Sequence, residues 1–420
     1  MKRAHGCLKK RIMNEIKKSV KLDNVYYDIR GVVVREAKLL EDRGFNVIKL
    51  NIGNPAAFGF NAPEQVVKEM ADNLRNAQGY GDAHGLLPAR EAVMRDFHGK
   101  GVKDIGVEDI YIGDGVSELI MIAMQSLLNP GDEVLVPMPD YPLWTAAVTI
   151  AGGKPVHYLC DETAGWNPDL DDMRSKVSSA TKAIVVINPN NPTGAVYDRG
   201  VLEGIAGIAR QNGLVVYADE IYSRITYDNS VHIPMSAVAP DILTVSFDGL
   251  SKAWQAAGFR AGWMVLSGNK KNASGYVEGL EILSNLRLCA NMPSQFGIQK
   301  ALGDSKSVSD LLLPGGRLKE QRDVTVNMVN AITGLSTVKP KGALYCFPKV
   351  DIKRFNITDD QQFMFDLLVD KHLLLVQGTG FNWKKPDHFR IVFLPDKDTL
   401  AEAMRRLGTF LETYRQRHGG

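Results

Sequence analysis

Between residues 91 and 290, short runs rich in β-branched residues alternate with longer amphipathic runs. Several of the short runs are nearly continuous in Val, Ile and Leu, which is typical of strands in a parallel sheet covered on both faces. The longer runs would supply the covering helices, joined to the strands by right-handed crossovers. The pattern therefore predicts an open α/β sheet. The expected strands include residues 109–113, 133–137, 183–188, 214–218 and 242–247, and the expected helices include residues 117–128 and 201–211.

The region after about residue 295 has a different pattern. Helical runs such as residues 317–333 alternate with short strand-like runs, which is typical of a smaller α+β domain. The strand-like runs are residues 343–347, 373–377 and 389–393. A chain of 420 residues is long enough for more than one core. We expect a basic N-terminal arm at residues 1–24, a segment at 25–62 that contributes to the small domain and the active site, a large domain at 63–295, and a small C-terminal domain at 296–420.

Charge and cysteine content narrow the class of function. The formal net charge is +2, which gives no reason to expect a nucleic-acid partner. The four cysteines are Cys7, Cys160, Cys289 and Cys346, and they form no Cys-x-x-Cys pair. Their spacing matches no metal site, so we expect no bound metal and reduced thiols, as in a cytosolic enzyme.

The first 22 residues of the N-terminal arm are basic but contain no apolar stretch of the kind found in secretory signals. A mitochondrial targeting peptide would be rich in Ser and poor in acidic residues, whereas this stretch contains Glu15 and a single Ser. We interpret it as a solvated arm. No apolar run approaches the roughly 20 residues that span a bilayer, so we expect a cytoplasmic protein without a membrane partner.

Polar residues follow four of the expected strands at the point where each strand ends. In open α/β sheets, functional groups collect just beyond the carboxyl ends of the strands. Each segment alone has an ordinary explanation as a turn, a helix cap or a solvated lysine, but the set in this order is far more specific. The segments are Asp114-Gly115-Val116-Ser117-Glu118, Asn188-Pro189-Asn190-Asn191-Pro192-Thr193-Gly194, Asp219-Glu220-Ile221-Tyr222, and Asp248-Gly249-Leu250-Ser251-Lys252 followed by Gly258-Phe259-Arg260-Ala261-Gly262-Trp263.

These segments resemble the signature of fold-type I aminotransferases, which depend on pyridoxal 5′-phosphate (PLP). The resemblance covers most of the chain, from about residue 26 to the C-terminal helix. It implies an αβα large domain that binds PLP, with a mostly parallel sheet, and a smaller α+β domain. The matching motifs are Asn191-Pro192-Thr193-Gly194, Asp219-x-x-Tyr222, Ser251-Lys252 and Arg260-x-Gly262. Three more, Asn51-Ile52-Gly53-Asn54-Pro55, Asp140-Tyr141-Pro142-Leu143-Trp144 and Gly249-Leu250-Ser251-Lys252, resemble bacterial glutamate–pyruvate (alanine) aminotransferases.

The resemblance assigns the residues around the cofactor ring. Lys252 would form a Schiff base with PLP and, once released, move the proton between the substrate Cα and the cofactor C4′. Both tasks need an unprotonated amine, so a depressed lysine pKa is expected. Asp219 would keep the pyridine nitrogen protonated, while strand alternation points Glu220 the other way. Tyr222 and Asn191 would hydrogen-bond the cofactor's 3′ oxygen.

The phosphate of the cofactor needs fixed hydrogen-bond donors. The backbone amides of Gly115 and Val116, at a helix N-terminus, suit an anion, and Ser117 would add a hydroxyl. Arg260 would supply a guanidinium for charge-assisted hydrogen bonds. Ser251 is a further candidate, and which hydroxyl reaches the phosphate stays open.

Four more positions complete the implied site. Tyr141 would lie flat against the pyridine ring, unless it is only a packed aromatic residue in a Pro-rich loop. Arg390 would bind the substrate α-carboxylate, because a planar guanidinium suits a carboxylate; the alternative is a surface arginine on an edge strand. Gly53 would let the backbone approach the substrate. Tyr80 matches a family tyrosine that reaches the phosphate of the neighbouring subunit, so the resemblance implies a homodimer with shared active sites.

A site that accepts both glutamate and alanine needs a positively charged side chain that can move away when alanine is bound. Arg30, which would pair with the distal carboxylate of glutamate and swing away otherwise, is the candidate, and Tyr27 would line the same pocket. A surface position for Arg30 is an equally good interpretation.

Three positions depart from the family pattern. Gly249 stands where relatives can carry a hydroxyl three residues before the lysine. Asp114 and Asp248 stand where close relatives tend to have Asn, and a carboxylate would repel the phosphate unless it faces away.

The expected reaction is a ping-pong transfer of the amino group between L-alanine and 2-oxoglutarate, giving pyruvate and L-glutamate. One alternative is an aminotransferase for valine or another neutral amino acid. A second is a PLP-dependent lyase on the same scaffold. A third, a non-catalytic regulator, is disfavoured because the segment before Gly53 is too short for a DNA-binding domain.

Overall fold

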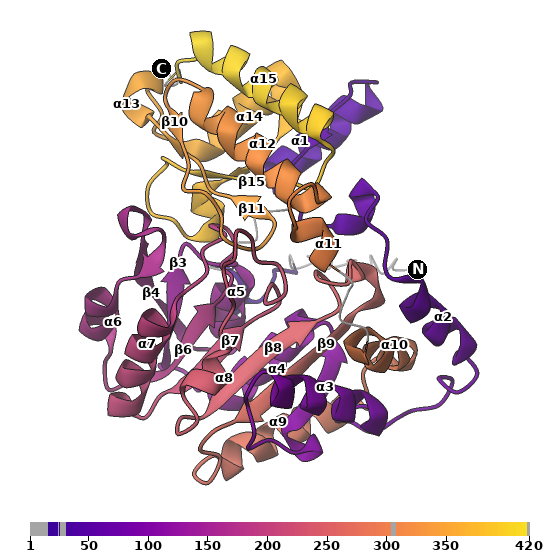
Figure 1. Cartoon of the computed structure of the whole chain (residues 1–420). Helices are drawn as coiled ribbons and strands as arrows, with labels where there is room; N and C mark the ends of the chain where they lie inside the picture. The colour runs from indigo at the N-terminus through magenta and orange to yellow at the C-terminus, as the bar shows by residue number, and fades with distance from the viewer. Residues whose placement is uncertain (1–15, 24, 26–30, 304–307, 418–420) are drawn as a thin grey trace, which may run out of the picture.

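A computed structural model describes residues 16–23, 25, 31–303 and 308–417, and an eight-stranded sheet lies at the centre of its larger part (Figure 1). In spatial order the strands are β2 (Ile110–Asp114), β9 (Ala261–Ser267), β8 (Thr244–Gly249), β7 (Val215–Asp219), β6 (Thr181–Ile187), β3 (Glu133–Met138), β4 (Lys154–Asp161) and β5 (Asn167–Pro168). Neighbouring strands from β8 to β4 are parallel. Strand β9 runs antiparallel to β2 and β8, and β5 runs antiparallel to β4. The predicted mostly parallel sheet is confirmed.

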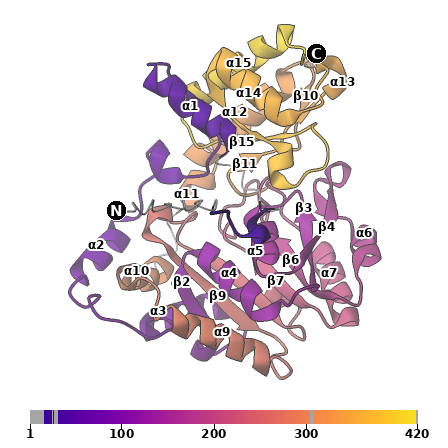
Figure 2. The ribbon, with the colours of Figure 1, turned by 180° about the vertical axis from the view of Figure 1, so that it is seen from behind.

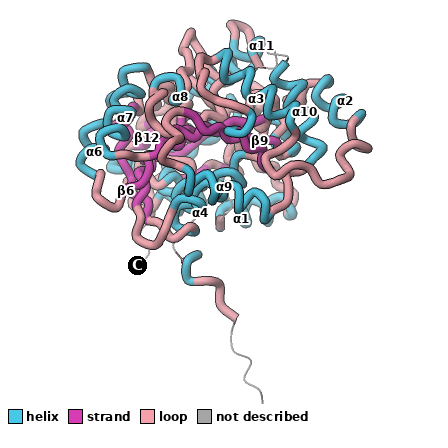
Figure 3. Tube along the Cα trace, turned by 90° about the horizontal axis from the view of Figure 1, so that it is seen from below, coloured by secondary structure: helices cyan, strands magenta, loops and turns pink. Residues whose placement is uncertain are grey.

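Helices cover both faces of this sheet, because its central strands are apolar on both sides. In β3, Val134 and Val136 belong to the core on one face and Leu135 to the core on the other. Figure 3 shows the sheet between two layers of helices. One layer contains α4 (Val116–Leu127), α5 (Leu143–Ile150) and α9 (Ser274–Leu286), and the other contains α6 (Leu170–Lys176), α7 (Arg199–Asn212) and α8 (Met235–Val238).

The sequence pattern located these elements closely. All five strands predicted for the central sheet form, and their ends lie within two residues of the prediction, as do those of α4 and α7. The strands β4, β5 and β9 fall outside the predicted set. At the β2 edge, α3 (Leu87–Gly99) and α10 (Met292–Gly303) pack together, with α2 (Glu64–Asp72) against α10. The predicted domain boundary at residue 295 falls inside α10, and the domain limits stay a prediction.

In the smaller part of the molecule, the described residues form three small sheets. Strand β15 (Phe389–Val392) lies between β11 (Tyr345–Cys346) and β14 (Val376–Gln377) and is antiparallel to both. Strands β10 (Leu335–Ser336) and β12 (Lys349–Val350) form an antiparallel pair. The helices are α11 (Ser309–Leu312), α12 (Arg317–Ala331), α13 (Ile352–Phe355), α14 (Asp360–Lys371) and α15 (Lys397–Thr413).

The N-terminal segment joins this smaller part. Strand β1 (Ile48–Lys49) pairs in parallel with β13 (Leu373–Leu374). Helix α1 (Val32–Asp42) buries Val33, Ala37 and Leu40 against Leu368 of α14, and Figure 2 shows α1 beside the C-terminal helices. Within the described ranges, no helix is long and apolar enough to cross a membrane.

Candidate active site

A pocket lies where the carboxyl ends of the parallel strands meet the small sheet of β11 and β15. Polar residues that follow β2, β3, β6, β7 and β8 line one side, and residues of β11 and β15 line the other. This is the edge at which the sequence placed the functional groups. The predicted site residues that line the pocket are Gly53, Val116, Ser117, Tyr141, Asn191, Asp219, Tyr222, Ser251, Lys252, Arg260 and Arg390.

Lys252 extends from the loop after β8 into this pocket. Its Nζ donates a hydrogen bond to the carbonyl oxygen of Gly53 at 2.7 Å and lies 5.9 Å from the centre of the Tyr222 ring. Lys252 is half-buried. The amine is therefore held inside the pocket, where it can reach a bound molecule.

Asp219 closes β7 and lies at the base of the pocket. Its Oδ2 accepts a hydrogen bond from Trp144 Nε1 at 3.0 Å, and burial raises the pKa of this carboxyl to about 6. Glu220, the next residue, instead accepts a hydrogen bond from the backbone N–H of Met235 at 2.9 Å. The side chains of these two neighbouring residues therefore point to opposite sides of the strand, as the alternation predicts.

Tyr222 meets a tyrosine that the sequence analysis did not select. The hydroxyl oxygens of Tyr222 and Tyr345 lie 2.6 Å apart, and both rings are buried. Burial and the neighbouring hydroxyl hold the pKa of Tyr222 well above its usual value, so this group keeps its proton and can donate it in a hydrogen bond. A Cβ on Gly53 would overlap the Tyr345 hydroxyl, which gives a steric reason for glycine at that position.

Arg390 projects from β15 into the pocket and is only 2% exposed. Its Nη1 donates to Asn191 Oδ1 at 2.9 Å, and its Nη2 donates to the carbonyl oxygen of Asn51 at 2.5 Å. The guanidinium also lies 4.4 Å from the ring centre of Tyr345 and 4.5 Å from that of Phe381. These contacts fix a cation on the side of the pocket formed by β15, which excludes the interpretation of Arg390 as a surface residue.

Gly115, Val116 and Ser117 lie beside Arg260 at the start of α4. Gly115 has a positive φ of 79°, and Val116 and Ser117 begin the helix and line the pocket. The Arg260 guanidinium donates to the carbonyl oxygens of Ala257 at 3.0 Å and Asp114 at 3.1 Å. A Cβ on Gly115 would overlap this guanidinium. The helix N-terminus and the arginine therefore lie together, as phosphate binding requires.

Comparison with known proteins decides the family. Residues 46–407 match the family model described as aminotransferase class I and II. The chain belongs to this family.

Several relatives match this chain over almost its full length. The chain is 57% identical to glutamate-pyruvate aminotransferase AlaA of Escherichia coli strain K12, over 96% of this chain and 100% of that protein. It is 52% identical to alanine aminotransferase of Mycobacterium tuberculosis strain H37Rv, over 95% of this chain and 93% of that protein. The structure of alanine aminotransferase from Pyrococcus furiosus superposes with a TM-score of 0.90, at 40% identity over 94% of this chain and 100% of that chain. The protein is an aminotransferase with the predicted fold.

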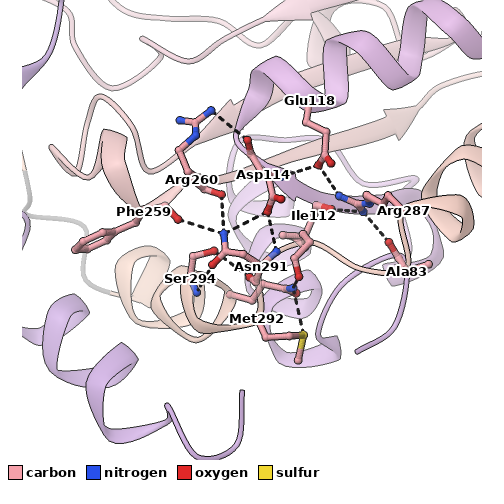
Figure 4. Close-up of polar contacts among 12 residues, drawn as sticks. Ala83, Ile112, Asp114, Glu118, Phe259, Arg260, Arg287, Asn291, Met292 and Ser294 are labelled. Atoms are coloured by element: carbon pink, nitrogen blue, oxygen red, sulfur yellow. Dashed lines mark hydrogen bonds and ion pairs between the residues drawn. The ribbon is translucent and has the colours of Figure 1, made fainter. Parts of the chain in front are cut away.

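The two unexpected carboxylates of this aminotransferase now have a physical account. Asp114 Oδ1 accepts hydrogen bonds from the backbone N–H and the side-chain amide of Asn291, at 2.7 and 3.2 Å, so the carboxylate is turned towards α10 (Figure 4). Asp248 Oδ2 accepts from Ser223 Oγ at 3.0 Å and lies 3.7 Å from Lys100 Nζ. Each negative charge is therefore matched by donors outside the pocket.

The loop before Lys252 has no room for a side chain at Gly249. A Cβ there would lie 2.7 Å from the carbonyl oxygen of Ala261 on the adjacent strand β9, which is backbone and cannot move aside. Among the predicted hydroxyls, Ser117 and Ser251 both line the pocket.

The outcome differs for three other predicted residues of the aminotransferase. Tyr80 lies on the surface and is 84% exposed. Tyr27 and Arg30 lie outside the described residues. Sequence reasoning missed the roles of Trp144 and Tyr345, although Trp144 belongs to the Asp140-Tyr141-Pro142-Leu143-Trp144 motif. Tyr345 lay inside a predicted strand and had no local signal.

Asp140 links the Tyr141 loop to the smaller part of the aminotransferase. Its carboxylate accepts hydrogen bonds from Asn382 Nδ2 at 2.6 Å and Thr145 Oγ1 at 2.7 Å. Its backbone N–H donates to the carbonyl oxygen of Phe381 at 3.0 Å, and Phe381 packs on Arg390. Complete burial raises the pKa of Asp140 to about 7. Asp140 therefore connects the loop of Tyr141 to the segment that supports Arg390.

Replacing Asp140 with Asn is expected to change how stability depends on pH. The pKa of Asp140 is about 7 in the fold and about 3.9 in an unfolded chain. The unfolded chain therefore releases this proton first, and the free energy of unfolding falls as pH rises between these two values. Asn does not titrate, so the variant should gain stability relative to the parent protein between pH 4 and pH 7, by up to about 4 kcal/mol.

Urea unfolding at pH 5 and pH 8, at one protein concentration, measures this difference. Asp198→Asn, at the exposed N-cap of α7, is a control with the same chemical change. Equal pH dependence of Asp140→Asn and the parent protein would contradict a buried proton on Asp140.

Proposed function

We propose that this aminotransferase uses PLP to move the amino group of L-alanine to 2-oxoglutarate, giving pyruvate and L-glutamate. The observation that carries the proposal is the convergence of Lys252, Asp219, Arg260 and Arg390 on one pocket. The relatives named as glutamate-pyruvate and alanine aminotransferases support the choice of substrates.

The donor set of the pocket fits PLP. Arg260 and the backbone N–H groups at the start of α4 could bind the phosphate. The buried carboxylate of Asp219 could pair with a protonated pyridine nitrogen. Burial is the main reason that the pKa of Asp219 is raised to about 6, and a cationic ring nitrogen beside it would favour the ionised carboxylate. When bound, PLP supplies an electron sink for the charge that develops at the substrate Cα.

The side chains of the pocket would have the remaining roles. Lys252 would hold the cofactor covalently and carry the proton between the substrate Cα and the cofactor C4′. Arg390, oriented by Asn191 and the Asn51 carbonyl, would bind the substrate α-carboxylate. Tyr222 would donate its hydroxyl proton to the cofactor's 3′ oxygen, and Tyr141 would pack against the ring.

Visible absorbance of the purified protein tests the proposal. We expect a yellow protein whose band is lost on addition of L-alanine and returns with pyruvate or 2-oxoglutarate, while pyruvate and glutamate form in the complete reaction. A protein that stays colourless with added PLP would contradict the cofactor. A yellow protein that does not respond to L-alanine would contradict the donor.

The apolar part of the pocket favours a second candidate donor. Ile52, Ile187 and Ile221 line it, and such apolar walls can contact a branched aliphatic side chain. Initial rates with L-valine and L-alanine at equal concentrations, with pyruvate and with 2-oxoglutarate as acceptors, distinguish the two assignments.

We propose in addition that the enzyme is a homodimer with shared active sites. Tyr80, Leu286 and Leu288 are 84%, 75% and 53% exposed, and Arg287, between the two leucines, donates to the carbonyl oxygen of Ala83 at 2.9 Å. Exposed apolar residues gathered in this way are typical of a protein interface. Light scattering is expected to give twice the chain mass of 46.3 kDa, and Leu286→Arg should reduce it. A fully active monomer would contradict the shared site.

A further inference from the structure

Tyr345 occupies a point where three parts of the pocket meet. Its hydroxyl lies 2.6 Å from that of Tyr222, and its ring face lies 4.4 Å from the Arg390 guanidinium. The pairing of β11 with β15 places Tyr345 opposite Val392, two residues from Arg390. The side chain is 2% exposed, and only a glycine at position 53 leaves room for its hydroxyl. Tyr345 is therefore fixed from several sides.

The proton count of the two tyrosines determines the direction of their hydrogen bond. A phenol hydroxyl has one proton to donate and can also accept. If Tyr222 donates to the cofactor's 3′ oxygen, its proton is committed there, and Tyr345 must be the donor in the contact between the two hydroxyls. Hydrogen bonds in such a chain strengthen one another, so Tyr222 becomes a better donor to a negatively charged oxygen.

We propose that Tyr345 is a positioning residue with two contacts of separate purpose. Its hydroxyl donates to Tyr222 and thereby stabilises the anionic form of the cofactor's 3′ oxygen. Its ring supports the Arg390 guanidinium that receives the substrate carboxylate. The inference rests on the proposed function, since it requires bound PLP.

Tyr345→Phe separates the first contact from packing, because it removes one oxygen and keeps the ring. The experiment is a pH titration of the visible band of the PLP-loaded enzyme without substrate. Loss of one hydrogen bond to the Tyr222 oxygen is expected to raise the apparent pKa of that band by about 0.5 to 1 unit. A role in packing alone would leave this pKa unchanged.

Tyr227→Phe is the matched control. Tyr227 is also buried, and its hydroxyl donates to the carbonyl oxygen of Ala343 at 2.9 Å, two residues before Tyr345. The apparent pKa of the visible band of Tyr227→Phe should equal that of the parent enzyme. Equal titrations of Tyr345→Phe and the parent enzyme would overturn the relay, while an enzyme that takes up no PLP would instead overturn the proposed function.

Tyr345→Leu tests the second contact. Loss of the aromatic face beneath a buried guanidinium is expected to raise KM for L-alanine by about 3- to 10-fold relative to Tyr345→Phe. The band titration of the two variants should agree, since both lack the hydroxyl. Equal KM values in the Phe and Leu variants would overturn the support of Arg390.

Discussion

Lys252→Ala is expected to abolish transamination, with a loss of at least about 10⁴-fold in rate. The lysine amine would serve both as the point of attachment of the cofactor and as the carrier of the proton, so one substitution removes two steps. No second lysine lines the pocket in the part of the chain that the structure describes. Steady-state formation of pyruvate from L-alanine, measured with added PLP, gives the size of the loss.

Two controls accompany this variant. Lys252→Arg keeps the positive charge, but its guanidinium stays protonated in proteins and cannot take up a proton, so it should be as inactive as Lys252→Ala. Lys154→Ala removes an exposed lysine that pairs with Glu133 and should leave the rate unchanged. Substantial turnover by Lys252→Ala would show that another base carries the proton.

Asp219→Asn is expected to lower the rate by about 10²- to 10⁴-fold while the protein still folds and binds the cofactor. The amide oxygen can still accept the Trp144 N–H, so the shape of the site is kept and only the negative charge is lost. Without that charge the pyridine nitrogen loses the partner that keeps it protonated. Single-turnover kinetics with L-alanine, together with the visible spectrum, separate slower chemistry from loss of cofactor.

Glu220→Gln is the matched control for Asp219→Asn, because the two carboxylates are adjacent on the chain and buried to the same degree. Glu220 points to the other side of the strand, where it accepts a hydrogen bond from the backbone N–H of Met235, and burial raises its pKa to about 8. Neutralising it should therefore change the rate little near neutral pH. Equal losses in the two variants would contradict the assignment of Asp219 to the cofactor.

Several of the site residues that the sequence predicted follow a strand directly, whereas Arg390 lies within β15 and was assigned by resemblance to the family. Lys252, Asp219 and Asn191 lie at strand ends, and the ends of parallel strands meet at one edge. Period-2 alternation along the strand also separates Asp219 from Glu220. These features are local, so a short segment of sequence is enough to place them.

The missed features depend on contacts between distant segments. Tyr345 meets Tyr222 across 123 residues, and Asp140 meets Asn382 across 242 residues, and nothing in either local pattern indicates such a partner. The antiparallel direction of β9 is different in kind. Only the Lys252 loop and a short 3₁₀ turn connect β8 to β9, and a connection without a crossover helix favours antiparallel strands. The sequence therefore held a signal for β9 that strand composition alone did not reveal.

The contacts that form the pocket join distant parts of the sequence, and this determines when a newly made chain can become active. The Lys252 amine donates a hydrogen bond to the carbonyl oxygen of Gly53, which is 199 residues away in the sequence. Arg390 donates a hydrogen bond to the carbonyl oxygen of Asn51, which is 339 residues away. Contacts of such long range form late, because the intervening chain must be ordered first. A ribosome-bound chain that ends before β15 has the whole central sheet but no groove for an amino acid. During refolding, recovery of helical circular dichroism should consequently precede the return of the yellow colour.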